Sequence, residues 1–266
     1  MSKYFVACDL DDTLLIKNKR ISFKSRMFIK KFVKKGNYFV ICTGRPFSSA
    51  NDFAKMLNVK MPIISDNGAS IYLPMEDRFI YFSINLDIFK ELLEQTNDYI
   101  NCAIANSNEK VVFQNRKEIP EWLVHYLPDA ILIDDTLLNS LDYNPILPTI
   151  WVKKDKKEEF EKILKTYNNE ISYRYWGLFD NGHSFELFSP NASKGLAMKY
   201  LAEYYDCDKT IAFGDQLNDL SMILMADYGV AMINGKKEAL EAAKYHTRKA
   251  NKHNGVIDFL KKNKLY

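Results

Sequence analysis

The sequence predicts an α/β protein whose core is a doubly wound parallel sheet, with an α+β domain inserted into it. Near both ends of the chain, short apolar segments ending in polar turns alternate with amphipathic helical segments. This alternation is typical of a Rossmann-like sheet with right-handed crossovers. Between residues 82 and 188, strand-like segments instead follow one another through turns. We therefore expect a core of residues 1–81 and 189–266 and an inserted domain of residues 82–188.

The first element of the core is the apolar segment 4–8, which ends abruptly in Asp9-Leu10-Asp11-Asp12-Thr13. A short run that is apolar on both faces indicates a central strand covered by helices on either side. Helical spacing of apolar residues follows over 22–35, and Gly36 is suited to end that helix. The remaining elements expected in this half of the core are a strand at 38–42, a helix at 48–57 and a strand at 62–65.

The inserted segment has helical patterns at 87–99 and 156–167. Asn181-Gly182 lies between two apolar stretches and is a strong hairpin signal. Trp122, Trp151 and Trp176 are expected in the core of this domain. Its strand-like segments are residues 101–105, 111–114, 122–126, 130–133, 148–152, 171–176 and 184–189.

The α/β alternation returns with a predicted helix over 193–204. The next apolar strand, 210–213, breaks at Gly214-Asp215, and a helix follows to about residue 225. The last elements expected are a strand at 228–231 and helices at 236–243 and 255–262.

Composition points to an ordinary soluble protein, with 47% apolar and 27% charged residues among 266. Its 37 Lys and Arg residues are scattered and the net charge is +3, which argues against nucleic acid as the main partner. No apolar run has the length of a membrane span, so no membrane association is expected. The four cysteines show no paired spacing, which favours a reducing, cytoplasmic compartment.

Polar residues follow several of the predicted strands, and the carboxyl ends of parallel strands converge on one crevice. Clustered carboxylates there suit Mg²⁺, which prefers oxygen ligands. A lysine at a helix start and a threonine with a following glycine add a cation and hydrogen-bond donors, as phosphoryl transfer requires. The residues concerned are Asp9, Asp11, Thr43, Lys194, Asp215, Asn218 and Asp219.

Each motif alone also has a simpler interpretation. The acidic segment 9–13 is compatible with a solvated turn that caps a helix, and Thr43 with a cap of the helix at 48. Lys194 is compatible with a solvated helix residue. Asp215 and Asp219 are compatible with acids favoured by a helix dipole. The combination of motifs is what favours a catalytic site.

Five motifs together resemble those of the haloacid dehalogenase superfamily. Their order and spacing are similar to those of its Cof-type phosphatases (subfamily IIB), which carry a large α/β cap domain inserted in the core. One departure is Asp12, where this family often has Gly. The motifs are Asp9-Leu10-Asp11-Asp12-Thr13-Leu14, Thr43-Gly44-Arg45, Asn67-Gly68-Ala69, Ser193-Lys194-Gly195 and Gly214-Asp215-x-x-Asn218-Asp219.

The resemblance implies a catalytic role for two carboxylates. Asp9 would be the nucleophile that becomes an aspartyl-phosphate, and it would also bind Mg²⁺. Asp11 would be the general acid and base, with its backbone carbonyl on the metal. Asp215 would be a further metal ligand, with Gln216 near the metal through its backbone and Asp219 in support.

The same resemblance implies a phosphate-binding set. It consists of the Leu10 amide, Thr43, Gly44, Lys194 and Asn218. The expected activity is therefore a Mg²⁺-dependent phosphatase acting on a small phosphorylated metabolite, such as a sugar phosphate. The alternatives are a phosphotransferase or phosphomutase with the same chemistry, and a phosphoacceptor signalling module.

The cap domain is expected to select the substrate, because the core residues all address the phosphoryl group, the metal or the proton. His183 and Glu186, in the hairpin that leads back to Lys194, are the candidates for contacting the leaving group. A plain surface turn is the alternative for both. The sequence identifies neither the substrate nor the oligomeric state.

Overall fold

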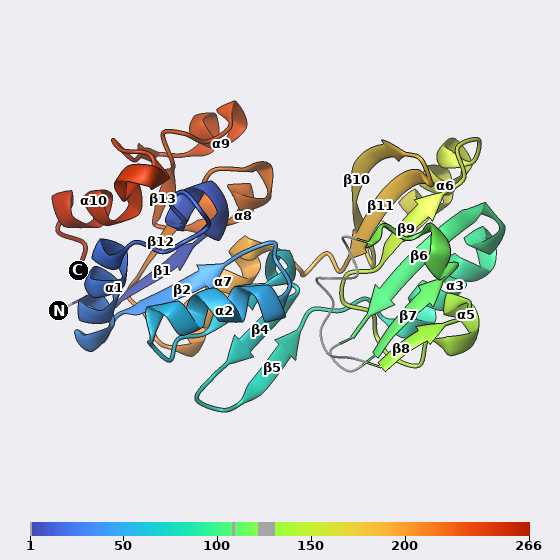
Figure 1. Ribbon diagram of the computed structural model, residues 1–266, viewed down its shortest axis with the longest axis horizontal. Coiled ribbons are helices and arrows are strands. Elements are labelled where there is room, and N and C mark those ends of the chain that lie inside the picture. Colours follow the sequence, from blue (N-terminus) through green and yellow to red (C-terminus); the bar gives the residue numbers. More distant parts are fainter. Residues whose placement is uncertain (1, 108–109, 122–130) are drawn as a thin grey trace. The chain divides into compact units, whose positions relative to one another are not determined.

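The computed structural model describes residues 2–107, 110–121 and 131–266 and divides the chain into two compact units (Figure 1). The core unit comprises Met1–Ile80 and Ser193–Tyr266, and the inserted unit comprises Tyr81–Ala192. Each unit contains one sheet, so the predicted α/β class is confirmed. The sequence-based division had set its boundaries after residues 81 and 188.

The core unit is built on an eight-stranded sheet in the order β14-β13-β12-β1-β2-β3-β4-β5. The pairs from β14 to β3 are parallel, and β4 turns back antiparallel to β3. Chain progression reverses between β1 and β12, so their carboxyl ends form a topological switch point. The strands are β1 (Tyr4–Cys8), β2 (Tyr38–Cys42), β3 (Ile63–Ser65), β4 (Ser70–Leu73), β5 (Arg78–Tyr81), β12 (Lys209–Gly214), β13 (Tyr228–Ala231) and β14 (Tyr245–His246).

Helices cover both faces of this sheet, which explains why its central strands are apolar throughout (Figure 1). Helices α1, α2 and α10 share one buried cluster with β1 and β2. Helices α8 and α9 pack with β13 in another. The helices are α1 (Phe23–Lys34), α2 (Phe47–Leu57), α7 (Lys194–Tyr204), α8 (Leu220–Met225), α9 (Lys237–Ala242) and α10 (Gly255–Lys262).

Three short strands of the core, β4, β5 and β14, were not predicted. β14 has only two residues and β4 and β5 have four each. The pairing of these segments depends on a neighbouring strand that is already in place, which the local sequence does not record.

The inserted unit has a six-stranded sheet in the order β10-β11-β9-β6-β7-β8, antiparallel except between β7 and β8. The predicted segment 122–126 lies outside the described residues. The strands are β6 (Ile100–Asn106), β7 (Lys110–Gln114), β8 (Ile131–Asp134), β9 (Thr149–Val152), β10 (Ser172–Phe179) and β11 (Gly182–Phe188), and the helices are α3 (Leu86–Thr96), α5 (Leu137–Ser140) and α6 (Lys157–Leu164).

The predicted hairpin is present, with Phe179 paired to Gly182 across the turn. Trp151 is buried, as predicted, whereas Trp176 is 54% exposed, so its assignment to the core was wrong. The register of the hairpin shifts between Tyr175 and Gly177, and this bulge on an edge strand leaves Trp176 outside the ladder. Trp122 lies outside the described residues.

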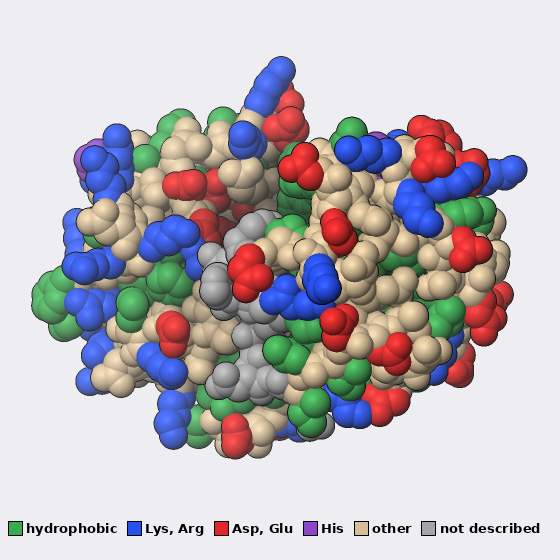
Figure 2. Space-filling model, turned by 45° about the vertical axis from the view of Figure 1, so that its right-hand side comes forward, with side chains coloured by type: hydrophobic (Ala, Val, Ile, Leu, Met, Phe, Trp, Pro, Cys, Tyr) green, Lys and Arg blue, Asp and Glu red, His purple; other side chains and the backbone are tan. Residues whose placement is uncertain are grey.

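Charged side chains of both signs are interspersed over the face drawn in Figure 2. Within the described ranges, the structure contains no helix with the length and apolarity needed to span a bilayer.

Candidate active site

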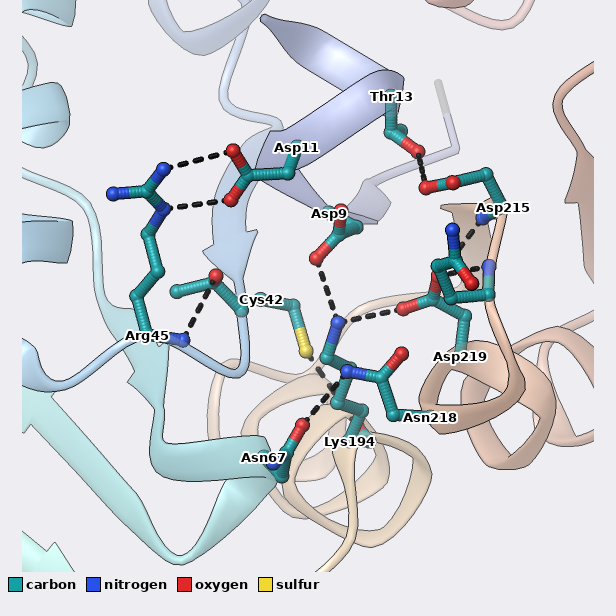
Figure 3. Close-up of polar contacts among 12 residues, drawn as sticks. Asp9, Asp11, Thr13, Cys42, Arg45, Asn67, Lys194, Asp215, Asn218 and Asp219 are labelled. Atoms are coloured by element: carbon teal, nitrogen blue, oxygen red, sulfur yellow. Dashed lines mark hydrogen bonds and ion pairs between the residues drawn. The ribbon is translucent and has the colours of Figure 1, made fainter. Parts of the chain in front are cut away.

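The candidate site lies where β1, β2, β3 and β12 of the core end, beside the start of α7 (Figure 3). Ser193 caps α7 by accepting a hydrogen bond from the Leu196 amide, so the next residue, Lys194, begins the helix at this edge. The structure brings together the following predicted or motif residues from separate segments: Asp9, Asp11, Thr13, Arg45, Asn67, Lys194, Asp215, Asn218 and Asp219. Thr43 joins them through its hydroxyl, which accepts a hydrogen bond from the Arg45 amide.

At the centre of the site, a buried lysine bridges two buried carboxylates. Lys194 Nζ lies 2.7 Å from Asp9 Oδ1 and 2.6 Å from Asp219 Oδ1. Burial raises the pKa of Asp9, and the neighbouring ammonium group opposes that rise. Burial alone would lower the pKa of Lys194, but the two carboxylates outweigh it and raise the pKa overall. Lys194 therefore stays charged and is no solvated helix residue.

Asp9, Asp215 and Asp219 form a buried acidic cluster whose carboxylate oxygens lie within 4.8 Å of one another. Burial raises the pKa of Asp215 to about 6, although the Thr13 hydroxyl donates a 2.9 Å hydrogen bond to it and opposes the shift. Crowded, desolvated carboxylates favour a bound cation. An all-oxygen set of this kind fits Mg²⁺.

Within this cluster Asp219 has a supporting position. Its Oδ2 accepts hydrogen bonds from the backbone amides of Asp215 and Gln216, at 2.8 and 2.9 Å, while Oδ1 accepts from Lys194. Gln216 forms a capping box with Asp219. A Cβ at Gly214 would lie 2.3 Å from the Asp219 Cβ, so only glycine fits there. Asp219 thus fixes the loop that carries Asp215.

The residues expected around the phosphate also come from separate segments. Thr43 is buried and is not the cap of α2, because Pro46 occupies that position. Asn218 Nδ2 donates a 2.9 Å hydrogen bond to Asn67 Oδ1. A Cβ at Gly44 would come within 2.8 Å of that same Asn67 oxygen. The Leu10 side chain is buried in the core cluster, so only the backbone of Leu10 is available to contact a ligand at the site.

Three polar contacts at the site were missed by the sequence analysis. Arg45 contacts Asp11 through two hydrogen bonds, Thr13 holds Asp215, and Asn67 holds Asn218. Arg45, Thr13 and Asn67 were recognised within motifs but given no role. The signal for Asn67 was its place in the polar turn after a predicted strand.

Asp12, the departure from the family pattern, has a left-handed backbone with φ of 54°. Glycine adopts this conformation without strain, whereas Asp tolerates it at some cost. The Asp12 carbonyl accepts a hydrogen bond from Asn234, and its carboxylate accepts one from Asn251. The left-handed backbone at position 12 is thus one in which glycine would also fit.

His183 and Glu186 are not brought together. Both lie on β11, where alternate residues point to opposite faces of the sheet. His183 shares its face with Phe185, which packs in the helix-covered core, and it bonds Tyr175 Oη through Nδ1 at 2.7 Å. Glu186 is on the other face in an ion pair with Arg174.

Comparisons with known proteins agree over nearly the whole chain. A family model described as haloacid dehalogenase-like hydrolase matches residues 6–260. The Bacillus subtilis protein named 5-amino-6-(5-phospho-D-ribitylamino)uracil phosphatase YitU is 30% identical, covering 97% of this chain and 96% of that protein. Phosphatase YwpJ, also from Bacillus subtilis, is 26% identical over 96% and 98% of the two chains. The crystal structure of TM0651 from Thermotoga maritima matches with a TM-score of 0.79 and 27% identity, over 98% and 97% of the chains.

Proposed function

Since this chain belongs to the haloacid dehalogenase superfamily and is a phosphatase similar to its Cof-type members, we propose that it is Mg²⁺-dependent and hydrolyses a small phosphorylated metabolite through an aspartyl-phosphate. The arrangement of Asp9, Lys194 and the acidic cluster carries this proposal. A buried carboxylate next to a fixed ammonium group and an oxygen-rich cation site matches the requirements of phosphoryl transfer.

In this mechanism an Asp9 oxygen attacks phosphorus while the phosphorus–oxygen bond to the leaving group breaks. Asp11 gives its proton to the departing oxygen. Asp11 then takes a proton from water, whose oxygen attacks phosphorus and breaks the bond to Asp9. Phosphate is released and both carboxyl groups return to their starting states.

The other residues bind and orient. Lys194, Thr43, Asn218 and the amides of Leu10 and Gly44 would hold the phosphoryl oxygens. Asp9, Asp215 and the Asp11 carbonyl would hold Mg²⁺, with Gln216 nearby and Asp219 supporting the loop. Mg²⁺, when bound, neutralises charge on the phosphoryl group and on the carboxylates.

The substrate is expected to be a small phosphate ester whose leaving group is an alcohol. The phosphoribitylamino-pyrimidine named for the Bacillus subtilis relative is the first compound to test, followed by sugar, nucleotide and pyridoxal phosphates. Phosphate release without an acceptor alcohol separates a phosphatase from a phosphotransferase or phosphomutase.

The test measures phosphate release from this panel for the wild type and for Asp9→Asn, which is nearly isosteric but cannot attack phosphorus. We expect Asp9→Asn to lose turnover while its melting temperature shows a folded protein. Asp52→Asn, which removes an exposed carboxylate, is the matched control and should keep full activity. Activity of Asp9→Asn within about tenfold of wild type, ~1.4 kcal/mol of barrier, would exclude this nucleophile.

The same assay tests the metal. A chelator should abolish phosphate release, and Mg²⁺ should restore it. Ca²⁺ should restore it poorly, since its longer bonds and looser geometry misplace the phosphoryl group. Full activity in excess chelator would refute the metal assignment.

A further inference from the structure

Arg45 and Asp11 form a two-point contact that the mechanism above does not use (Figure 3). Arg45 Nε lies 2.6 Å from Asp11 Oδ2, and Nη2 lies 2.8 Å from Oδ1. Parallel hydrogen bonds from one guanidinium fix both the direction and the plane of a carboxylate. The Asp11 side chain is 48% exposed, so it has room to rotate unless it is held.

Arg45 is itself held in place by its surroundings. Its Nη1 donates a 3.0 Å hydrogen bond to Ser49 Oγ, and its guanidinium carbon lies 5.2 Å from the centroid of the Phe53 ring. Its backbone amide donates to Thr43 Oγ1 at 3.2 Å. The start of α2 and the end of β2 therefore fix Arg45, and its side chain is only 18% exposed.

We propose that Arg45 is a positioning residue for Asp11. Arg45 holds the Asp11 carboxyl group in the orientation from which Asp11 exchanges a proton with the leaving group and with water. The inference rests on the proposed function, because it assumes that Asp11 carries the proton. Arg45 acts through Asp11, and no contact between Arg45 and the phosphoryl group is required.

The shape of the guanidinium matters to this role. It presents two parallel N–H groups to the two carboxyl oxygens, and this fork fixes the plane of the Asp11 carboxyl group. A lysine ammonium group is a point charge without this planar fork. Lys at position 45 should therefore restore only part of the function of Arg45.

A leaving-group comparison tests this role. 4-Nitrophenolate departs without being protonated, whereas an alkoxide needs a proton from Asp11. General acid and base catalysis contributes roughly 10²–10⁴-fold, so we expect Arg45→Ala to lower kcat/KM for an alkyl phosphate about 10–100-fold. For 4-nitrophenyl phosphate the loss in kcat/KM, which reports the step that expels the leaving group, should stay within about threefold. Arg45→Lys should be intermediate for the alkyl ester.

The matched control is Arg78→Ala. It also removes an ion pair between an arginine and a carboxylate, Glu76, but Arg78 lies on β5 at the edge of the sheet. It should leave kcat/KM for both esters unchanged. An equal loss on both esters in Arg45→Ala, or a rise in KM alone, would overturn the proposal, since either points to structural damage or to direct binding of the phosphoryl group.

A double-mutant comparison asks whether Arg45 works through Asp11. If it does, adding Arg45→Ala to Asp11→Ala should cause no further loss on the alkyl ester, because the group it positions is already gone. Losses that multiply in the double variant would refute the proposal.

A readout independent of turnover separates this proposal from the proposed function. The Nε–H signal of Arg45 in a ¹⁵N spectrum is identified by its absence in Arg45→Lys. Replacing Asp11 by Ala should shift this signal and speed its exchange with water. An unchanged signal would overturn the role of Arg45, even if the protein is an active phosphatase. A shifted signal in a protein that hydrolyses no phosphate ester would instead refute the proposed function, while Arg45 would still position Asp11.

Discussion

At the scale of single residues, Asp66 is a buried carboxylate in a turn whose backbone φ is 52°. Burial raises its pKa to about 6 despite a 3.0 Å hydrogen bond from the Ser65 hydroxyl. In the unfolded chain its pKa is about 3.8. Between these two values the folded state binds more protons, so the free energy of unfolding falls as pH rises through that window. The penalty is complete above the folded pKa and absent below the unfolded one.

Asp66→Asn should remove this penalty. The difference in the free energy of unfolding between the variant and wild type should be ~2–3 kcal/mol more favourable to the variant at pH 7.5 than at pH 4. Urea unfolding of both proteins at the two pH values measures this difference. A stability difference that does not change with pH would show that Asp66 titrates normally.

Asp12 is an exposed acid in the same segment as the proposed nucleophile. Burial is the main cause of the raised pKa of Asp215, and the negative charges of Asp219 and Asp12 add to it. Asp12 therefore contributes to the potential that attracts a cation. Asn tolerates the left-handed backbone as Asp does, so Asp12→Asn removes the charge alone.

We expect Asp12→Asn to raise the Mg²⁺ concentration for half-maximal activity about two- to fivefold, as an exposed charge contributes ~0.5–1 kcal/mol. Raising the ionic strength should shrink the difference, because salt screens exposed charges. Magnesium titrations at low and high salt measure both effects. An unchanged titration at low salt would show that Asp12 has no influence on the metal.

At the scale of secondary structure elements, the start of α7 fixes Lys194. The next residue, Gly195, donates its amide to Ser221 Oγ at 3.1 Å, and a Cβ there would lie 2.5 Å from the Ser221 carbonyl oxygen. Helices α7 and α8 thus approach so closely that only glycine fits between them. The position of the lysine depends on this contact.

Gly195→Ala should push α7 away from α8. Overpacking of this kind costs about 1–3 kcal/mol, and we expect kcat/KM to fall as Lys194 moves away from Asp9. Gly36→Ala is the control, because Gly36 has φ of 87° but open space around it, so it should lose stability without losing activity per folded molecule. Equal activity of the two variants would contradict this role of the α7–α8 contact.

At the scale of the whole molecule, the core unit contains all the residues proposed for chemistry, and we propose that the inserted unit selects the substrate. His183 and Glu186 lie on opposite faces of its sheet, so a ligand on one face contacts at most one of them. Glu186 lies on the face away from the helical core, next to Arg174, and is the better candidate.

We expect Glu186→Ala to change the ratio of kcat/KM values between phosphate esters about tenfold or more, ~1.4 kcal/mol. His183→Ala should change it within about twofold and serves as the matched control from the same strand. The panel of esters used for the wild type measures both variants. Ratios that stay constant in Glu186→Ala would place substrate choice elsewhere in the chain.

Local sequence patterns were sufficient to predict most elements of this protein. Apolar runs and helical periodicity located the central strands and most helices, because burial on both faces leaves a pattern within a few residues. The predicted start of the helix at 193–194 and Asp9 at the end of β1 follow from the same local chemistry. The order of the motifs identified the superfamily and the residues that gather at the site.

The contacts between side chains at the site depend on the three-dimensional fold. Lys194 reaches Asp9 across 185 residues, and Arg45 reaches Asp11 across 34. Such contacts depend on the register of strands and the direction of side chains, which no local pattern records. The exposure of Trp176 was missed for the same reason, because the bulge in its strand arises from pairing with a neighbouring strand. Short-range patterns therefore fixed the elements and their ends, whereas long-range geometry fixed the partners within the site.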